Sequence, residues 1–214
     1  MKKLLVGLLL VASSVLSFGA QRVPIEKVVA NGDLLYIQGE QKPYSGEIER
    51  KYPSGKTLVV ATVKAGKLDG KIYEYYENGK VKSEGNYVNG KADGVAKSYH
   101  QNGKLYSEAT FKNGVQVGVQ KDYYENGKVA TETTYKNNQQ TGPAKIYDEN
   151  GKLAVEFNLV NGKAEGLVKT YYPNGKIRTE ENYKNDERDG LAKAYDENGK
   201  VVQQATFKNG KQVK

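Results

Sequence analysis

Cysteine and tryptophan are absent from the 214-residue chain, and histidine occurs only once. Without cysteine the chain forms no disulfide bond, offers no thiol nucleophile and holds no thiolate zinc site. One histidine also argues against a multi-histidine metal site and against a Ser-His-Asp hydrolase. Glycine-rich phosphate loops, nucleophile elbows and paired zinc-binding histidines do not occur in the sequence. We therefore expect a protein that is not an enzyme and that has no cofactor.

Apolar side chains are also scarce, at 37% of the chain, whereas glycine occurs 24 times and tyrosine 17 times. Glycine exceeds its average share of about 7% and buries no side chain, so a large hydrophobic core is not expected. The tyrosines argue against disorder, because disordered chains are poor in aromatic residues. The formal net charge of +8 suits an acidic partner, or it serves only solubility.

The first twenty residues have the order of a secretory signal peptide. Residues 2 and 3 are lysines, residues 4–12 are apolar, and residues 13–20 are small or apolar. We expect cleavage after residue 19 or 20 and export to the periplasm, the outer surface or the medium. The alternative is an uncleaved membrane anchor, although the run is at the low edge of the about 20 apolar residues that a spanning helix needs. No cysteine follows the run, which argues against a lipoprotein.

A 24-residue repeat dominates the rest of the chain, and glycine marks it in three registers without insertion or deletion. The first register comprises Gly55, Gly79, Gly103, Gly127, Gly151, Gly175 and Gly199, each followed by lysine. The second comprises Gly46, Gly70, Gly94, Gly118, Gly142, Gly166 and Gly190. The third comprises Gly66, Gly90, Gly114, Asn138, Gly162, Asp186 and Gly210. Its two exceptions are Asn and Asp, the residues that best tolerate positive φ after glycine.

Each repeat has the pattern of a β-hairpin. The unit that begins at Gly70 reads GKIYEYYENGKVKSEGNYVNGKAD, with short alternating runs around Asn-Gly pairs. We expect Asn78-Gly79 to form a two-residue type I′ turn, which needs positive φ at both residues. The predicted fold class is all-β: an elongated single-layer antiparallel sheet built from seven 24-residue β-hairpin repeats. Each unit then contacts mainly its neighbours.

The predicted organisation has three parts. Residues 1–20 are the signal peptide, residues 21–45 are an N-terminal lead and a degenerate cap, and residues 46–214 are the seven-unit array. The cap is suggested by Leu34–Ile37, which resembles half of a repeat, and atypical terminal repeats are expected in such arrays. Residues 21–30 are expected to be flexible.

The proposed turn fixes the pairing of the strands. It places Glu77 opposite Lys80 and Tyr76 opposite Val81. The same offset pairs lysine with glutamate at Lys97–Glu108, Lys121–Glu132, Lys145–Glu156 and Lys169–Glu180, each worth about 0.2–1 kcal/mol. It also pairs glycine with an aromatic ring at Gly70–Tyr87, Gly94–Phe111, Gly118–Tyr135, Gly166–Tyr183 and Gly190–Phe207. A ring over a cross-strand glycine offsets the weakness of glycine in a sheet.

This register gives the sheet two different faces. One is small and apolar and carries Ile72, Tyr76, Val81, Ser83, Gly85 and Tyr87. The other carries Tyr75, Lys82, Glu84 and Asn86 and, in later units, Lys97 and Glu108. The candidate binding face is the tyrosine column of this second face: Tyr75, Tyr99, Tyr123, Tyr147, Tyr171 and Tyr195. These rings either contact a lipid or polysaccharide surface or only stiffen the sheet lengthwise.

Two further groups were considered as sites. His100 replaces a tyrosine, and we interpret it as a variant at a half-buried aromatic position rather than as a metal ligand or pH sensor. An acidic residue precedes the second-register glycine in four repeats, at Asp69, Asp93, Glu165 and Asp189. Consecutive ones lie one repeat apart, about 9–10 Å, which is too far for a compact metal site. We expect them to bond their own turn backbone.

The pattern resembles the MORN-repeat variant family over about residues 32–214. The shared features are a tyrosine pair before E-N-G-K, as at residues 75–80, an aromatic residue at Tyr87, and N-G-K-x-D-G at residues 89–94. The resemblance implies a twisted single-layer sheet that serves as a binding or scaffolding module. Many bacterial relatives are labelled antitoxin components (the YwqK type). Other MORN repeats are linked to phospholipids, and exported relatives to the cell envelope and adhesion.

Three functions follow as hypotheses. The first is an exported scaffold that binds a protein or an envelope surface, with a role in adhesion. The second is an antitoxin-like inhibitor of a partner toxin, which suits an exported chain only if the toxin is exported. The third is a module that binds anionic lipid or a membrane surface, weakened by salt. No nucleic-acid partner is expected, because each lysine of the face has a glutamate partner. The sequence does not specify the oligomeric state.

Overall fold

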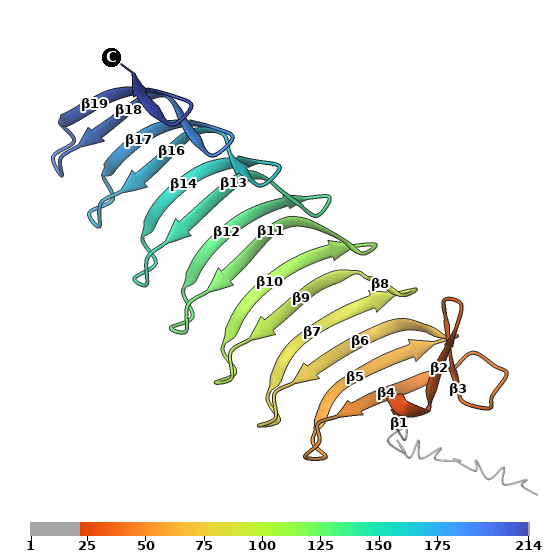
Figure 1. Ribbon diagram of the computed structural model, residues 1–214. Coiled ribbons are helices and arrows are strands. Elements are labelled where there is room, and N and C mark those ends of the chain that lie inside the picture. The colour runs from red at the N-terminus through yellow and green to blue at the C-terminus, as the bar shows by residue number, and fades with distance from the viewer. Residues whose placement is uncertain (1–21, 214) are drawn as a thin grey trace, which may run out of the picture.

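In the computed structural model, which describes residues 22–213, the chain is a long, twisted row of hairpins (Figure 1). The strands of the row are β4 (Gly46–Lys51), β5 (Thr57–Lys64), β6 (Lys67–Tyr75), β7 (Val81–Val88), β8 (Lys91–Ala92), β9 (Gly94–Tyr99), β10 (Leu105–Lys112), β11 (Val115–Tyr123), β12 (Val129–Lys136), β13 (Gln139–Tyr147), β14 (Leu153–Val160), β15 (Lys163–Ala164), β16 (Gly166–Tyr171), β17 (Ile177–Lys184), β18 (Glu187–Tyr195), β19 (Val201–Lys208) and β20 (Lys211–Val213). The all-β, antiparallel hairpin array predicted from the repeat is confirmed. The expected signal peptide lies outside the described residues.

The N-terminal end of the row carries a second layer. Strand β1 (Val23–Pro24) pairs in parallel with β4, and the short 3-10 helix η1 (Ile25–Lys27) follows it. Strands β2 (Val28–Asn31) and β3 (Leu34–Ile37) then form a separate two-stranded sheet. Within the lead expected to be flexible (residues 21–30), residues 23–30 therefore belong to strands and a helical turn. Within residues 22–213 no helix reaches the length and hydrophobicity needed to cross a bilayer.

The turn at Asn78-Gly79 is not the type I′ turn that we predicted. Gly79 has a φ of 84°, but Asn78 is not among the described residues with positive φ. The backbone N–H of Gly79 donates to the carbonyl of Tyr76, and Tyr76 N–H donates to the carbonyl of Lys80, both at 2.8 Å. The loop therefore has three residues and ends in a left-handed glycine, the next most common hairpin connection.

The type I′ turn occurs instead at the other Asn-Gly pair of each repeat. Asn89 and Gly90 have φ values of 50° and 82°, and the residues that flank them, Val88 and Lys91, are paired. Where the third glycine register is interrupted, Asn138 and Asp186 take φ values of 65° and 71°. The interpretation of these two residues as substitutes for a positive-φ glycine is confirmed.

The register in the body of the strands is the predicted one, although it is offset next to the turn and restored by a bulge. Tyr75 pairs with Val81, and a β-bulge then restores the pairing of Glu74 with Ser83. The loop is one residue longer than the predicted turn and shifts the register by one residue, and the bulge shifts it back. The predicted facing of Tyr76 with Val81 and of Glu77 with Lys80 is therefore wrong at the turn itself.

The bulge also changes the face of two side chains. Val81 lies opposite Tyr75, on the tyrosine face rather than on the small apolar face. Lys82, expected beside Tyr75, instead reaches Glu74 on the opposite face, with 2.9 Å between Nζ and Oε1. A one-residue slip moves a side chain across the sheet, because strand side chains alternate between the faces.

Glycine and aromatic residues are cross-strand partners as predicted, but the ring does not rest on the glycine. The confirmed pairs are Gly70–Tyr87, Gly94–Phe111, Gly118–Tyr135, Gly166–Tyr183 and Gly190–Phe207. At Gly94, Gly118 and Gly166 no atom lies within 4 Å of the position that a Cβ would take. Their φ values of 103°, 76° and 83° require glycine instead.

The β2–β3 hairpin and the segment that follows it, up to Tyr44, form a cap over the first repeats. The cap covers a small hydrophobic core of Ile48, Ala61 and Val63, against which Val28 and Leu35 pack. Along the row the side chains are mostly half-buried, since a single-layer sheet leaves both faces beside solvent. Three of the six buried apolar residues described thus cluster under the cap, and the other three are Val60, Ala144 and Leu159.

Replacing Val63 by alanine should lower the free energy of unfolding by about 2 kcal/mol, because Val63 is 2% exposed and its methyl groups leave a cavity under the cap. The control is Val95→Ala on the open row, where the side chain is 48% exposed and a change within about 0.5 kcal/mol is expected. Urea denaturation measures both. Equal destabilisation by the two variants would contradict a buried core under the cap.

Candidate functional site

The six candidate tyrosines end the first strand of the second to seventh hairpins and form a column along the row. Five of them hydrogen-bond to the unit before their own. The hydroxyls of Tyr99, Tyr123, Tyr147, Tyr171 and Tyr195 donate to the carboxylates of Glu84, Glu108, Glu132, Glu156 and Glu180 at 2.6, 2.8, 2.8, 2.6 and 2.7 Å. Tyr75 differs because Val60 stands where that glutamate would be, and its ring lies 6.2 Å from the ring of Tyr73.

The same glutamates belong to a ladder of alternating charges that crosses the sheet. Neighbours in the ladder are directly paired in this order: Glu84, Lys97, Glu108, Lys121, Glu132, Lys145, Glu156, Lys169, Glu180 and Lys193. The four predicted Lys–Glu pairs are confirmed within hairpins. The ladder adds equivalent pairs between hairpins, so each internal lysine lies between two glutamates.

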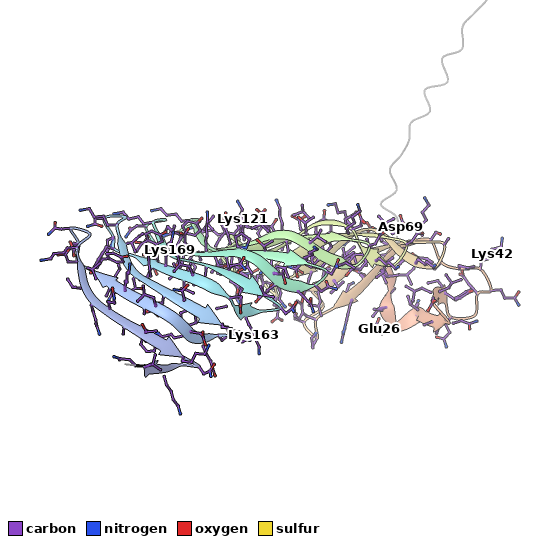
Figure 2. All side chains as sticks on the ribbon, turned by 90° about the horizontal axis from the view of Figure 1, so that it is seen from above. Glu26, Lys42, Asp69, Lys121, Lys163 and Lys169 are labelled. Atoms are coloured by element: carbon purple, nitrogen blue, oxygen red, sulfur yellow. The ribbon has the colours of Figure 1, made fainter. Side chains whose placement is uncertain are left out.

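The closest ionic contacts show both kinds of pairing. Lys121 lies 3.3 Å from Glu132 within a hairpin, and Lys169 lies 3.4 Å from Glu156 of the preceding one. Figure 2 shows Lys121 and Lys169 on the array, with side chains projecting from the sheet along its whole length. Each exposed pair contributes about 0.2–1 kcal/mol, so the ladder matters through its repetition.

The hydrogen bonds of the column change the pKa values of both partners. Burial and the neighbouring glutamate raise the pKa of Tyr99, Tyr123, Tyr147 and Tyr171 to about 12. The hydroxyls of Tyr147 and Tyr171 lower the pKa of Glu132 and Glu156, respectively. The pairs therefore hold a neutral tyrosine and an ionised glutamate. A ligand that needs these hydroxyls must compete with an existing charge-assisted bond.

A second set of tyrosines joins the units through the backbone. The hydroxyls of Tyr52, Tyr76, Tyr124 and Tyr172 donate to the main-chain oxygens of Tyr75, Tyr99, Tyr147 and Tyr195 at 2.8, 2.6, 2.6 and 2.7 Å. His100 occupies this position in its unit, where the equivalent acceptor is the carbonyl of Tyr123. Its Nε2 is buried without a hydrogen-bond partner, and its ring packs edge-on against Tyr106.

Both rims of the sheet are also joined from unit to unit. Lys80, Lys104 and Lys128, which follow the first-register glycines, donate to carbonyls of the next turn at 2.8, 2.6 and 2.9 Å. At the other rim Asp69, Asp93, Glu165 and Asp189 accept the backbone N–H of Asn89, Asn113, Asn185 and Asn209. We had expected these acids to bond their own turns, and this is wrong, because the partner lies 20 residues further on. These carboxylates join neighbouring repeats.

The small apolar face contains a hollow that the sequence did not reveal. It has a volume of about 350 Å³ and lies over the second and third hairpins. Its floor is formed by Ile72, Gly85, Ala96 and Ala109, and Tyr87 and Phe111 stand at one side. We call it the trough. The only sequence signal is that these floor positions carry small residues.

Several polar groups beside the trough are hydrogen-bonded within the chain. Ser83 donates to Glu74, and Ser107 donates to Asp122 at 2.6 Å. Gln120 donates to Asp122 and accepts from Gln116. These larger polar side chains end the run of small residues beyond the third hairpin. Within residues 22–213 no cluster of three or more His, Asp or Glu side chains is arranged to hold a metal ion. The trough thus has a mainly apolar lining, and the hydroxyls of Ser83 and Ser107 beside it are already paired.

Comparison with protein families matches the MORN repeat variant to six segments of the chain. The segments are residues 68–89, 92–113, 116–137, 140–161, 164–185 and 188–209. No curated protein matches the chain. One similar solved structure is a crystal structure of a TarM mutant from S. aureus in complex with fondaparinux, alpha-GlcNAc-glycerol and UDP. The identity is 10% and the TM-score 0.25, over 66% of this chain and 21% of that one, so it carries no functional argument.

Alkaline pH should loosen the array through the tyrosine column. The stability that the four tyrosines add is fully present below their ordinary pKa of 10.0 and is lost as the pH rises toward about 12. Urea unfolding between pH 9 and 12 should show this loss. Tyr123→Phe should lower stability at pH 9 and flatten the decline above pH 10. An absorbance titration in which all tyrosines ionise near pH 10 would contradict the prediction.

Replacing His100 by tyrosine should stabilise the chain by about 0.5–1.5 kcal/mol, because the new hydroxyl reaches the Tyr123 carbonyl as its equivalents do. The control is His100→Phe, which supplies a ring without a donor. The urea midpoint should rise for the tyrosine variant only. An equal rise for phenylalanine would show that ring packing, and not the hydrogen bond, limits this unit.

Proposed function

The chain belongs to the MORN repeat variant family, and we propose that it is an exported, non-enzymatic scaffold that binds another protein through its long sheet. Its repeats form a binding array in which each hairpin is an equivalent piece of one extended surface. The observation that carries the proposal is that polar and apolar side chains have different roles. The regular polar groups join neighbouring units, while apolar groups stay open to contact.

Exposed apolar side chains support a protein partner. Val95, Val119 and Leu167 occupy equivalent positions in their units and are 48%, 46% and 41% exposed. The trough adds an apolar hollow on the other face. Contiguous apolar surface on a folded protein marks interaction sites. An enzyme is disfavoured because the recurring tyrosines and carboxylates are bonded to each other rather than directed at a common reaction centre.

A lipid-binding role is less well supported than a protein-binding role. The net charge of +8 favours an anionic surface. However, ladder lysines such as Lys121 lie between two glutamates, and turn lysines such as Lys80 donate to backbone carbonyls. Their charges are thus already partly compensated within the chain. Export itself is supported by the signal-like order of residues 1–20.

Fractionation of native cells should find the protein outside the cytoplasm, with an N-terminus at Ala20 or Gln21, because residues 1–20 have the order of a cleaved signal peptide. N-terminal sequencing of the recovered protein measures this. An intact Met1 in the cytosol would overturn export and make an antitoxin-like inhibitor the leading function.

Binding is tested on the same material. The purified chain should retain an envelope or host-surface protein saturably and in fixed stoichiometry, and salt should have little effect. The matched variant lacks residues 94–117, which removes 24 residues, including part of the apolar hollow, and keeps the repeat register. It should fold and bind more weakly. Retention of anionic vesicles alone, abolished by salt, would replace the proposed function with lipid binding.

A further inference from the structure

The cap and the trough lie on one continuous face of the sheet. Ile48, Ala61 and Ile72 are direct cross-strand partners in sequence, and Ile72 is followed by Gly85 in the same row. The cap packs on the first part of this row, and the trough opens on the second part. Ile72 contributes to both, because it packs against the core under the cap and also lines the trough.

The cap shows which chemistry this face accepts. Val28 and Leu35, one from each strand of the β2–β3 hairpin, place aliphatic side chains against Ile48, Ala61 and Val63. Beyond Ile72 the floor residues shrink to Gly85, Ala96 and Ala109. The same face therefore lacks the aliphatic volume there that the cap provides over the first repeats. Filling it with apolar side chains would stabilise by about 25 cal/mol for each Å² removed from water.

The rim beside the cap offers a second turn with the geometry of the one that holds the cap. Leu35 N–H donates to the carbonyl of Gly66, in the turn between the first two hairpins, at 2.8 Å. The equivalent turn of the next unit is Asn89-Gly90, which has the same left-handed geometry. A second hollow of about 430 Å³ lies between Leu35 and this turn. It is lined by Gly66, Leu68 and Gly90 and also by the charged residues Asp33, Lys67 and Lys91. An extended segment placed there would meet the Gly90 carbonyl as Leu35 meets Gly66.

We propose that a partner protein docks a β-hairpin or extended segment beside the cap, with aliphatic side chains in the trough. The segment would continue the second layer that the chain itself begins with β2 and β3. This inference rests on the proposed function, of which it names the docking site and the kind of partner. Main-chain contacts at the rim provide affinity and the small-residue floor provides specificity.

The surroundings favour such a segment over a charged or sugar ligand. The hydroxyls of Ser83 and Ser107 are donated to Glu74 and Asp122, so they are not available to orient a polar ligand without loss. The floor carries no charge. The glutamine pair Gln116–Gln120 ends the small-residue floor, which limits the trough to the second and third hairpins. The occupant is therefore short and apolar at its contact.

The test is a selection from a phage-displayed library of two-stranded hairpins with randomised strand positions, against the full chain. The selected hairpins should carry Leu, Val or Ile at alternate positions. The Ala96→Phe/Ala109→Phe variant fills the floor and should weaken them at least tenfold. The control is Thr110→Phe, which adds a ring next to Ala109 but on the opposite face of the same strand. It should change the affinity less than threefold.

Circular dichroism melts establish that the variants fold, and Ala96→Leu alone is the milder substitute if the double variant does not. Hairpins that bind the filled variant as well as the unaltered chain would overturn the docking site. Hairpins blocked only by the opposite-face variant would do the same while leaving the scaffold function intact. Selection of charged or polar strands, or of no hairpin, would refute the apolar-segment chemistry. The scaffold function fails only if no surface protein is retained.

Discussion

The hydrogen bond from a tyrosine hydroxyl to the glutamate of the preceding unit is the contact on which the array depends most. A single-layer sheet has no second layer to cover it, so hydrophobic burial is small outside the cap. Cohesion between units must then come from backbone ladders and from polar side chains that repeat with the units. The Tyr–Glu bond joins two hairpins and orients the carboxylate toward the lysine ladder. The raised pKa of the tyrosines reflects how far each pair is withdrawn from water.

The two faces acquire different roles from this constraint. On the tyrosine face, hydroxyls, carboxylates and ammonium groups are occupied with each other, and the rims are joined by lysine and by aspartate or glutamate. Over the second and third hairpins the floor of the opposite face is formed mainly by small residues, which bury little apolar surface. That face is covered by the cap at one end and stays open over the second and third hairpins. A surface that contributes little to the fold is free to be shaped for a partner.

The cap solves a further problem of the architecture. A row of antiparallel strands has an end strand with unpaired backbone groups, which invites pairing with other chains. At the N-terminal end β1 pairs with β4, and the β2–β3 hairpin packs over the first repeats. The same element that protects this end supplies a second layer over the small-residue face. The cap therefore both protects the end strand and adjoins the open trough.

The sequence by itself determined the repeat, the hairpins and the strand register, because turn residues and alternating side chains act over a few positions. It did not separate the two Asn-Gly pairs of a unit, since both have the same local pattern and cross-strand pairing decides the loop length at each. Only the tertiary structure decided what the tyrosine column does. The partner of Tyr123 is Glu108, 15 residues earlier in another hairpin, and only the stacking of units brings them together. Tertiary packing likewise decided the trough beside the cap. Leu35 packs onto Ile48 and Val63, and this contact follows no periodic pattern in the sequence.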